Sequence, residues 1–297
     1  MMRAKRALLV GMAGALVAGV TIVGLGGTSA ASGKAMFRQP VGLNHFLCYG
    51  ATTDPAVGPG FTVPPGVTVV NPLTPAGGFG PFLPGAAVTF DRHCNPAVKT
   101  LVVAKTKKVK ATFPILNTGW HLSCFTVTNP VPPVVPTATV KNQFGQAALA
   151  LQPPSDLCAP TQKSLQSATS LEPTGGIQPD HLTCYPVTYA TATTKPFKVP
   201  AADLVTVQDE FATGPQTVQV LAPETLCVPT EKILPTGKVY AVANPKANLL
   251  CFGVTPTQVI SPVWDSNQFG VSPVVIPSPP NDERLCLPST VKLPKVK

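Results

Sequence analysis

Residues 181–185 read His-Leu-Thr-Cys-Tyr, and residues 227–232 read Cys-Val-Pro-Thr-Glu-Lys. Between these two stretches, Phe211 follows the polar pair Asp209-Glu210. Two cysteines with similar flanks and a phenylalanine between them occur in the same order four times along the chain, and such self-similarity indicates a repeat architecture. The first copy departs at the turn, where Gly78 precedes Phe79 in place of a polar residue. The chain is therefore built from four diverged copies of one unit.

The eight cysteines fall into two kinds according to their flanking residues. A histidine precedes each opening cysteine by three residues, except that Asn248 stands there in the fourth copy. A lysine follows each closing cysteine by five residues, except that Lys292 comes one residue late. The opening cysteines are Cys48, Cys124, Cys184 and Cys251, and the closing ones are Cys94, Cys158, Cys227 and Cys286. The phenylalanines of the turn between them are Phe79, Phe144, Phe211 and Phe269.

One cysteine begins each unit and one ends it, which suggests four disulfides in sequential order. Eight cysteines allow 105 pairings in principle, and the repeat favours one of them. We number the units 1 to 4 and expect the pairs Cys48–Cys94, Cys124–Cys158, Cys184–Cys227 and Cys251–Cys286. Each closed loop should stabilise its unit by about 4 kcal/mol in the chain-entropy model.

The distance from the opening cysteine to the turn phenylalanine alternates between long and short. It is 31, 20, 27 and 18 residues in units 1 to 4. Both long arms carry Phe-x-Val-Pro, at residues 61–64 and 197–200. A two-unit module that was then duplicated explains this order. We therefore expect two domains, residues 42–163 and 178–292, with the break at the polar segment 164–179.

The composition predicts an all-β fold of short strands. Proline (36) and glycine (24) make up about a fifth of the 297 residues, and these two residues disfavour long helices. Hydrophobic residues reach 44%, so a core can form. Residues 204–207 and 217–220 show the residue types and alternation of strands. We expect four disulfide-closed units of about four short strands each, arranged as two duplicated sandwich- or barrel-like modules.

The N-terminus has the pattern of a signal peptide. Arg3, Lys5 and Arg6 precede an apolar stretch over residues 7–23, and small residues follow at 29–31. This pattern predicts cleavage after residues 1–31 and export; the alternative is an uncleaved anchor. The mature protein is expected to be secreted or held at the cell surface, without stable membrane insertion after cleavage.

The residues that carry chemistry give no catalytic or metal-binding pattern. The recurring His-x-x-Cys could suggest a metal site, but on a strand these two positions face opposite sides. His93 stands beside Cys94 as a candidate nucleophile and base, although a disulfide would remove the thiolate. No nucleophile elbow, zinc-protease motif or phosphate loop is present. We therefore expect no enzyme activity, no metal and no cofactor.

Two tryptophans and a group of lysines are the candidate binding residues. Trp120 and Trp264 each occur in a single unit, unlike the aromatic residues that recur in every unit and are expected in the core. The lysines are Lys99, Lys105, Lys107, Lys108 and Lys110. They could contact an anionic cell-wall polymer, or simply face solvent on a strand or linker. No nucleic-acid-binding motif accompanies them, so no nucleic acid is expected as a partner.

The three recurring features together resemble a repeat family of unknown function found in exported bacterial proteins. The likeness covers most of residues 42–292, and units 2 and 3 match best. It implies export, β structure and disulfides, and it transfers no activity and no catalytic residue. The expected function is a non-enzymatic structural or binding role in the cell envelope or extracellular space, for an unknown ligand there. An exported hydrolase or a secreted enzyme inhibitor is the alternative, and the oligomeric state stays open.

Overall fold

The computed structural model describes residues 43–294, except 59, 85–87, 104–105, 107, 172–177, 202–203, 258–261, 278–279 and 281. These residues form eighteen strands and no helix, which confirms the all-β prediction. The predicted signal peptide, residues 1–31, lies outside the described part.

Each unit contributes four strands, as the sequence predicted, and a further strand follows units 1 and 3. Unit 1 holds β1 (His45–Gly50), β2 (Thr52–Thr53), β3 (Thr68–Val70) and β4 (Phe90–Val102), and β5 (Val109–Phe113) follows it. Unit 2 holds β6 (His121–Thr126), β7 (Thr137–Asn142), β8 (Gly145–Leu151) and β9 (Asp156–Ser164). Unit 3 holds β10 (His181–Tyr189), β11 (Val205–Gln208), β12 (Gln216–Val218) and β13 (Val220–Ile233), and β14 (Val239–Tyr240) follows it. Unit 4 holds β15 (Asn248–Val254), β16 (Val263–Asn267), β17 (Gly270–Val275) and β18 (Glu283–Lys292).

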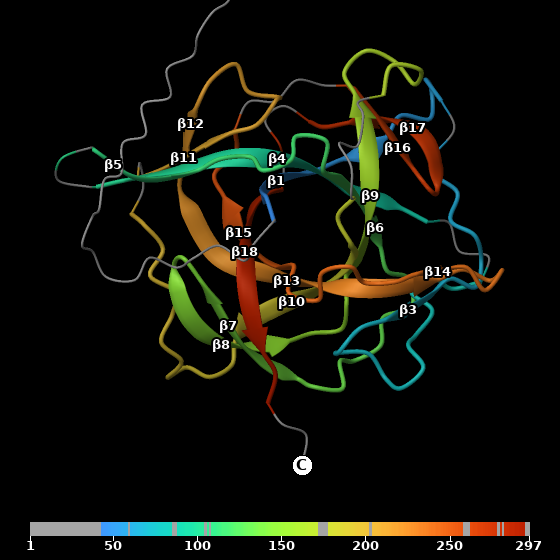
Figure 1. Cartoon of the computed structure of the whole chain (residues 1–297), viewed down its shortest axis with the longest axis horizontal. Coiled ribbons are helices and arrows are strands. Elements are labelled where there is room, and N and C mark those ends of the chain that lie inside the picture. Colours follow the sequence, from blue (N-terminus) through green and yellow to red (C-terminus); the bar gives the residue numbers. More distant parts are fainter. Residues whose placement is uncertain are drawn as a thin grey trace, which may run out of the picture. The chain divides into compact units, whose positions relative to one another are not determined.

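The eight cysteine-bearing strands form one closed antiparallel ring. Their order around the ring is β1, β4, β6, β9, β10, β13, β15 and β18, and β18 pairs again with β1. The remaining strands lie around this ring in four groups, which Figure 1 shows at its four corners. A closed sheet of eight strands leaves an interior that side chains can just fill.

All four expected disulfides are present, and they fill the middle of the ring. The bonds are Cys48–Cys94, Cys124–Cys158, Cys184–Cys227 and Cys251–Cys286. Neighbouring disulfides touch, since the sulfurs of Cys48 and Cys286 lie 3.6 Å apart and those of Cys158 and Cys184 lie 3.7 Å apart. Residues two positions before the opening cysteines pack with them, because side chains alternate along a strand.

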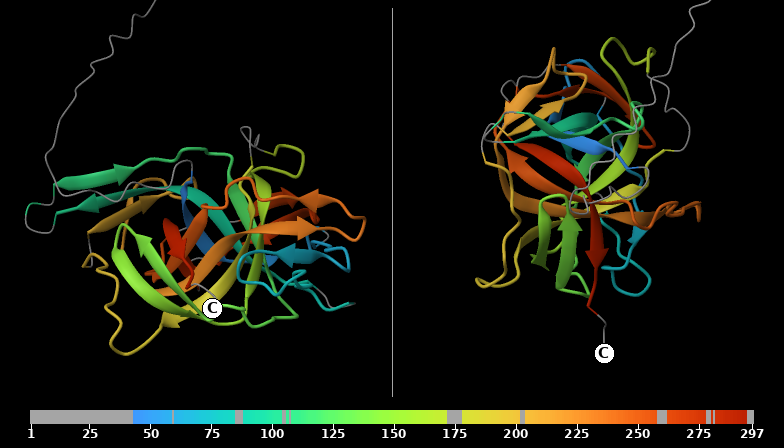
Figure 2. Two further views of the ribbon diagram at one scale, coloured as in Figure 1. Left: turned by 60° about the horizontal axis from the view of Figure 1, so that its bottom comes forward. Right: turned by 60° about the vertical axis from the view of Figure 1, so that its left-hand side comes forward.

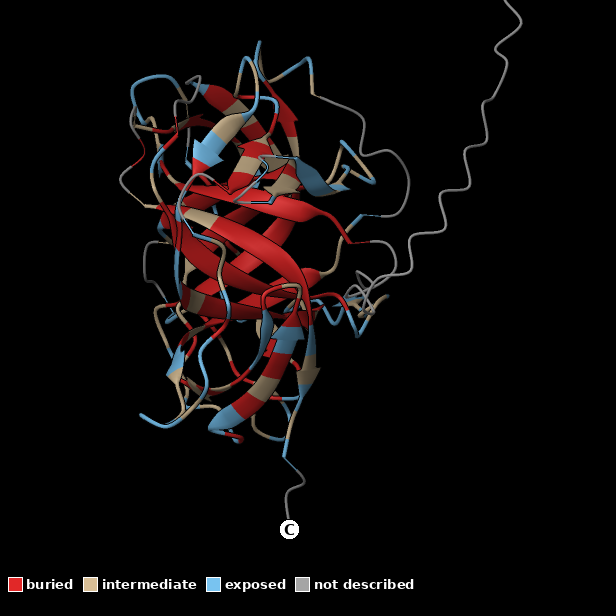
Figure 3. Cartoon of the chain, turned by 90° about the vertical axis from the view of Figure 1, so that its left-hand side faces the viewer, coloured by how far each residue is buried: buried red, intermediate tan, exposed pale blue. Residues whose placement is uncertain are grey.

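The same alternation points the aromatic residue after each opening cysteine out of the ring. These residues (Tyr49, Phe125, Tyr185 and Phe252) are buried in an outer core that surrounds the ring. Figure 3 shows the ring strands as the continuously buried part of the molecule, with exposed residues on the peripheral segments. The recurring aromatics are thus packing residues, as the sequence suggested.

The arm of each unit reaches across to the opposite unit. β3 of unit 1 pairs with β13 of unit 3, and β11 of unit 3 pairs with β4 of unit 1. Likewise β7 pairs with β18, and β16 pairs with β9; Figure 2 shows β7 and β8 beside β18. The predicted division into residues 42–163 and 178–292 is not confirmed, because β9 and β10 pair across the expected break and the arms join the two halves.

The recurring histidine, lysine and turn phenylalanine meet where one unit contacts the next. We call these meeting points joints. Joint 1 contains His45, Lys99 and Phe144; joint 2 contains His121, Lys163 and Phe211; joint 3 contains His181, Lys232 and Phe269. The phenylalanine belongs to the unit after the one that supplies histidine and lysine. Its turn is closed by an Asx contact, in which the side chain of Asn142, Asp209 or Asn267 accepts the amide N–H two residues later.

Unit 1 makes this turn at a different place from the one that the sequence suggested. Asn71 Oδ1 accepts the N–H of Leu73 at 2.8 Å, which is the same contact. Asn71 also bonds the Tyr185 hydroxyl, as Asp209 bonds that of Tyr49. Leu73 therefore takes the phenylalanine position, and Phe79 packs elsewhere, beside Val69. The assignment of Phe79 to the repeat was wrong.

The lysine expected at the end of unit 4 is also displaced. Val291, five residues after Cys286, occupies the position of the buried lysines, whereas Lys292 is exposed. The fourth joint thus consists of Asn248, Val291 and Leu73, which all line one pocket.

Candidate functional site

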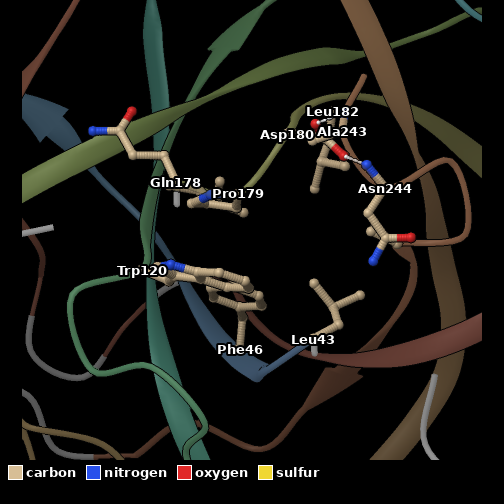
Figure 4. A pocket seen from close by; sticks show the side chains of 11 residues that line it. Leu43, Phe46, Trp120, Gln178, Pro179, Asp180, Leu182, Ala243 and Asn244 are labelled. Carbon is tan, nitrogen blue, oxygen red and sulfur yellow. Dashed lines mark hydrogen bonds between the residues drawn. The ribbon is translucent and has the colours of Figure 1, made fainter. Parts of the chain in front are cut away.

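A candidate site lies at the apolar end of the ring. Phe46, Leu122, Leu182 and Leu249 cover the disulfides there as an apolar layer. The repeat position two residues earlier lies beyond this layer and differs in every unit. It is Asn44, Trp120, Asp180 and Ala247 in units 1 to 4. A pocket opens at this level, and we call it the mouth pocket (Figure 4).

The two long units use this variable position to hold loops. Asn44 accepts the N–H groups of Leu116 and Asn117 at 2.7 and 3.2 Å and donates to the Asn117 carbonyl at 2.6 Å. Asp180 accepts the N–H groups of Ala243 and Asn244 at 2.7 and 2.8 Å. Both side chains use their polar atoms to bind backbone. Asp180 and the residues that it binds, Ala243 and Asn244, line the mouth pocket.

The two short units leave the same position open to the pocket. Trp120 lines one side and small Ala247 leaves room on another. The indole Nε1 of Trp120 is buried and has no hydrogen-bond partner among the described residues. The N–H lies at the end of the indole away from Leu43 and Asn244, so the ring contributes apolar surface to the pocket (Figure 4).

The rest of the mouth pocket is mainly apolar with a polar edge. It encloses about 440 Å³, including the part that is open to solvent. Asn244 places its amide group at the edge, whereas the amide of Gln178 points away from the pocket (Figure 4). The residues that line it are Leu43, Phe46, Trp120, Leu122, Gln178, Pro179, Asp180, Leu182, Ala243, Asn244 and Ala247. Apolar pockets with a few convergent polar groups are the usual form of small-molecule sites.

The opposite end of the ring is closed by charges. Arg92 binds Asp282 at 2.6 Å, and Arg284 binds Glu224 at 2.7 Å. Burial acts to raise the pKa of the Asp282 carboxyl, but the charges and hydrogen bonds of Arg92 and Arg284 outweigh it, and the pKa is lowered. This end offers an ion-pair network, whereas the mouth offers open apolar surface.

A buried polar network has the residue types of a hydrolase site but not its geometry. Asp265 Oδ2 accepts the Ser123 hydroxyl at 2.8 Å and lies 2.8 Å from His93 Nδ1. The carboxylate stands between serine and histidine, whereas a serine hydrolase needs the histidine in the middle. The other nitrogen of His93 faces Asn95 Oδ1 at 2.7 Å. Ser123, His93 and Asp265 are all fully buried, so substrate has no access to them.

The electrostatics of this network suit a structural role. Burial acts to lower the pKa of His93, but the Asp265 carboxylate outweighs it and the pKa is raised. Cys94, the other half of the candidate nucleophile–base pair, is bonded to Cys48 and is excluded as a nucleophile. His93 thus supports the fold by bridging Asp265 and Asn95.

Two of the recurring lysines are buried without a hydrogen-bond partner among the described residues. Lys99 Nζ lies 4.3 Å from the centroid of Phe113 and 5.2 Å from that of Phe144. Lys232 Nζ lies 4.3 Å from Tyr240 and 4.9 Å from Phe269. Burial lowers the pKa of Lys232 to about 7 and that of Lys99 well below its ordinary value. Such amines can be nucleophiles, but both are fully buried, and aromatic rings are their neighbours.

The sequence-predicted binding residues are separated in the structure. Trp120 lines the mouth pocket, whereas Trp264 lies half-exposed on β16 and does not. Lys108 and Lys110 are exposed at β5, and Lys105 and Lys107 lie outside the described residues. Lys99 belongs to joint 1, so its place in a surface lysine cluster was a wrong prediction.

The described residues contain no group of three or more His, Cys, Asp or Glu side chains that could hold a metal ion. In the same part of the chain, no helix meets the length and apolarity that crossing a membrane requires.

No family model, curated protein or solved structure matches this chain. The likeness to an exported bacterial repeat family therefore stays a prediction. The four disulfides are consistent with an oxidising, extracellular environment.

The sequence reasoning singled out Trp120 but missed the pocket around it. A signal was present: counting back four residues from each opening cysteine gives four unrelated residue types in an otherwise regular repeat. This position lies at the end of the ring, so it can carry a binding residue without disturbing the scaffold.

Proposed function

We propose that this protein is a non-enzymatic binding protein of the cell envelope or extracellular space, with the mouth pocket as its ligand site. The observation that carries the proposal is the indole ring of Trp120, which lines an apolar pocket at the end of a ring stapled by four disulfides. The disulfides fix the floor of the pocket, and Asp180 holds the Ala243–Asn244 wall. Such preorganisation lowers the entropy cost of binding.

The lining favours a small neutral amphiphile. Leu43, Phe46 and Leu182 offer apolar contact for a hydrocarbon group. The amide of Asn244 offers a donor for a carbonyl, ester or hydroxyl oxygen. The Asp180 carboxylate in the same lining disfavours an anionic head group.

Tryptophan fluorescence tests this proposal directly, because the chain has only two tryptophans. In a Trp264→Phe background the emission reports Trp120 alone. Titration with methyl octanoate is expected to change the emission saturably, and octanoate is expected to bind at least tenfold more weakly. The double variant Trp264→Phe/Trp120→Phe is the binding control. Its binding is measured by calorimetry, because it has no tryptophan.

Three results distinguish the proposal from its alternatives. The absence of saturable binding of methyl octanoate, 1-octanol and octyl glucoside would reject the mouth pocket as an amphiphile site. Release of methanol from methyl octanoate would favour an exported hydrolase. Inhibition of a protease panel by the mature protein would favour a secreted inhibitor.

A further inference from the structure

The fourth joint differs from its three counterparts in every recurring side chain. Asn248 replaces histidine, Val291 replaces lysine and Leu73 replaces phenylalanine. Pro72 also stands where Gln143, Glu210 and Gln268 contact the histidines of the other joints. Each replacement is smaller than the residue it stands for, so side-chain volume is lost at one place.

The lost volume remains as a pocket. All four of these residues line it, and it encloses about 610 Å³ including its solvent-open part. We call this pocket the open joint. Backbone pairing keeps its walls apart, since β3 is hydrogen-bonded to β13 and β15 to β18, so the surroundings cannot collapse into the space.

The chemistry of the open joint is apolar with one free amide. Pro229, Val242 and Val291 form part of the apolar lining. Asn71 has no spare polar atoms, because it bonds Leu73 N, Tyr185 Oη and Thr230 Oγ1. Asn248 is 8% exposed, lines the pocket, and its side chain has no hydrogen-bond partner among the described residues. Its amide atoms are not sealed from the pocket, so they can bind a polar group that enters with a ligand.

The filled joints show which group fits such a place. At joint 1 the ring of Phe113 lies 5.1 Å from His45, and at joint 3 the phenol ring of Tyr240 lies 5.4 Å from His181. These rings come from β5 and β14, which follow units 1 and 3. No aromatic ring of the described residues lines the open joint.

We propose that the open joint binds a small phenolic compound, whose ring takes the place of the aromatic residues of the other joints and whose hydroxyl bonds the Asn248 amide. An apolar cavity of this kind is known to accept benzene-sized rings. The proposal is independent of the mouth pocket, which lies at the end of the ring and shares no lining residue with the open joint.

The test is a titration of the full mature protein with p-cresol, followed by methyl NMR of its leucines and valines. A dissociation constant of about 1 mM is expected for a ligand of this size. Shifts should be confined to methyls such as those of Leu73, Val242 and Val291. Trp120→Ala should leave these shifts unchanged, which separates the site from the mouth pocket.

Three variants examine the roles of volume and of the amide. Leu73→Phe/Asn248→His restores the side chains of the other joints and should weaken p-cresol at least tenfold; Leu73→Phe alone should weaken it severalfold and guards against a folding defect in the double variant. Asn248→Ala should weaken p-cresol about fivefold and leave toluene unchanged.

Three results would overturn the proposal. These are an absence of open-joint shifts at 20 mM p-cresol, equal affinity in the Leu73→Phe variant and the wild type, or equal affinity for cyclohexanol and p-cresol. The first two deny a site at this joint, and the third denies its preference for an aromatic ring.

Discussion

Joints 1 to 3 and the open joint are built on the same backbone and filled in opposite ways. The three filled joints bury an imidazole, a lysine and a phenyl ring, whereas the open joint presents Asn248, Val291 and Leu73 around a pocket. The comparison shows that the recurring His and Lys serve contacts between units. It also shows that the scaffold tolerates their loss, because the ring and its disulfides persist in unit 4.

The largest expected difference between the joints is in their tolerance of truncation. Phe269→Ala should lower the free energy of unfolding by about 4 kcal/mol, because Phe269 is buried at joint 3. Leu73→Ala should cost only about 2 kcal/mol, since the open joint already lacks part of its packing. Urea denaturation followed by circular dichroism measures both. Equal costs would show that the two joints are packed alike.

A buried amine at joint 3 makes the free energy of unfolding depend on pH above neutrality. Burial, with a contribution from Lys238, lowers the pKa of Lys232 to about 7, while in the unfolded chain it is about 10.4. The unfolded state binds more protons between these values, so stability rises with pH from about 7 to 10.4. Lys232→Met should raise stability at pH 7 by roughly 3 kcal/mol and flatten this slope.

The exposed Lys238 provides the control for this change. Lys238→Met should affect stability only slightly, because an exposed amine has little desolvation cost. Thermal unfolding of the three proteins at pH 7, 8.5 and 10 gives the comparison. A Lys232→Met variant that follows the wild-type pH slope would contradict the assignment.

The histidine of joint 3 makes stability depend on pH in the acidic range. Burial, and then Lys232, lowers the pKa of His181 to about 4, against about 6.5 unfolded. The unfolded state again binds more protons between these values, so stability is lost as pH falls from 6.5 toward 4. His181→Asn copies the residue of the open joint and should remove about 2 kcal/mol of this loss at pH 4.5.

Other groups that titrate in this range cancel in the difference between variant and wild type. Burial raises the pKa of Glu283 to about 7, which gives an opposing slope common to both proteins. The measurement is therefore the difference in unfolding free energy at pH 4.5 and 7. Parallel curves for the two proteins would assign the acid sensitivity to other groups.

The smallest expected effect is a gain in stability at the open joint. Leu73→Phe restores the ring that the repeat places at this position and should raise the free energy of unfolding by about 1 kcal/mol. Differential scanning calorimetry would show the corresponding rise in melting temperature. A loss of stability would mean that the joint has closed around leucine and has no room for a ring.

Local patterns predicted the elements of this fold but not their partners. The flanks of Cys184 and Cys227 predicted a disulfide, and the residue types and alternation of residues 204–207 and 217–220 predicted strands, because both kinds of signal lie within a few residues. The pairing of β11 with β4 leaves no such trace. Four similar strands can each accept an arm, and the choice depends on how all of them close together.

The candidate site shows the same division between local and tertiary information. Trp120 was predicted to bind because it breaks the repeat, whereas the loops that surround it arrive through tertiary contacts of Asn44 and Asp180. Leu73 was missed because Asn-Pro-Leu does not resemble Asn-Gln-Phe-Gly in sequence. The Asx contact of Asn71, which is a feature of three-dimensional structure, reveals the equivalence.

The exchange of arms between opposite units bears on how such a chain could have arisen by duplication. Unit 1 needs the arm of unit 3 and unit 2 needs that of unit 4, so a chain with two units leaves its arms and both edges of its half-ring without partners. An ancestor with two units could have closed the same ring only as a homodimer, its two chains exchanging arms. Gel filtration of residues 178–292 would test this history: a monomeric, folded half would contradict it.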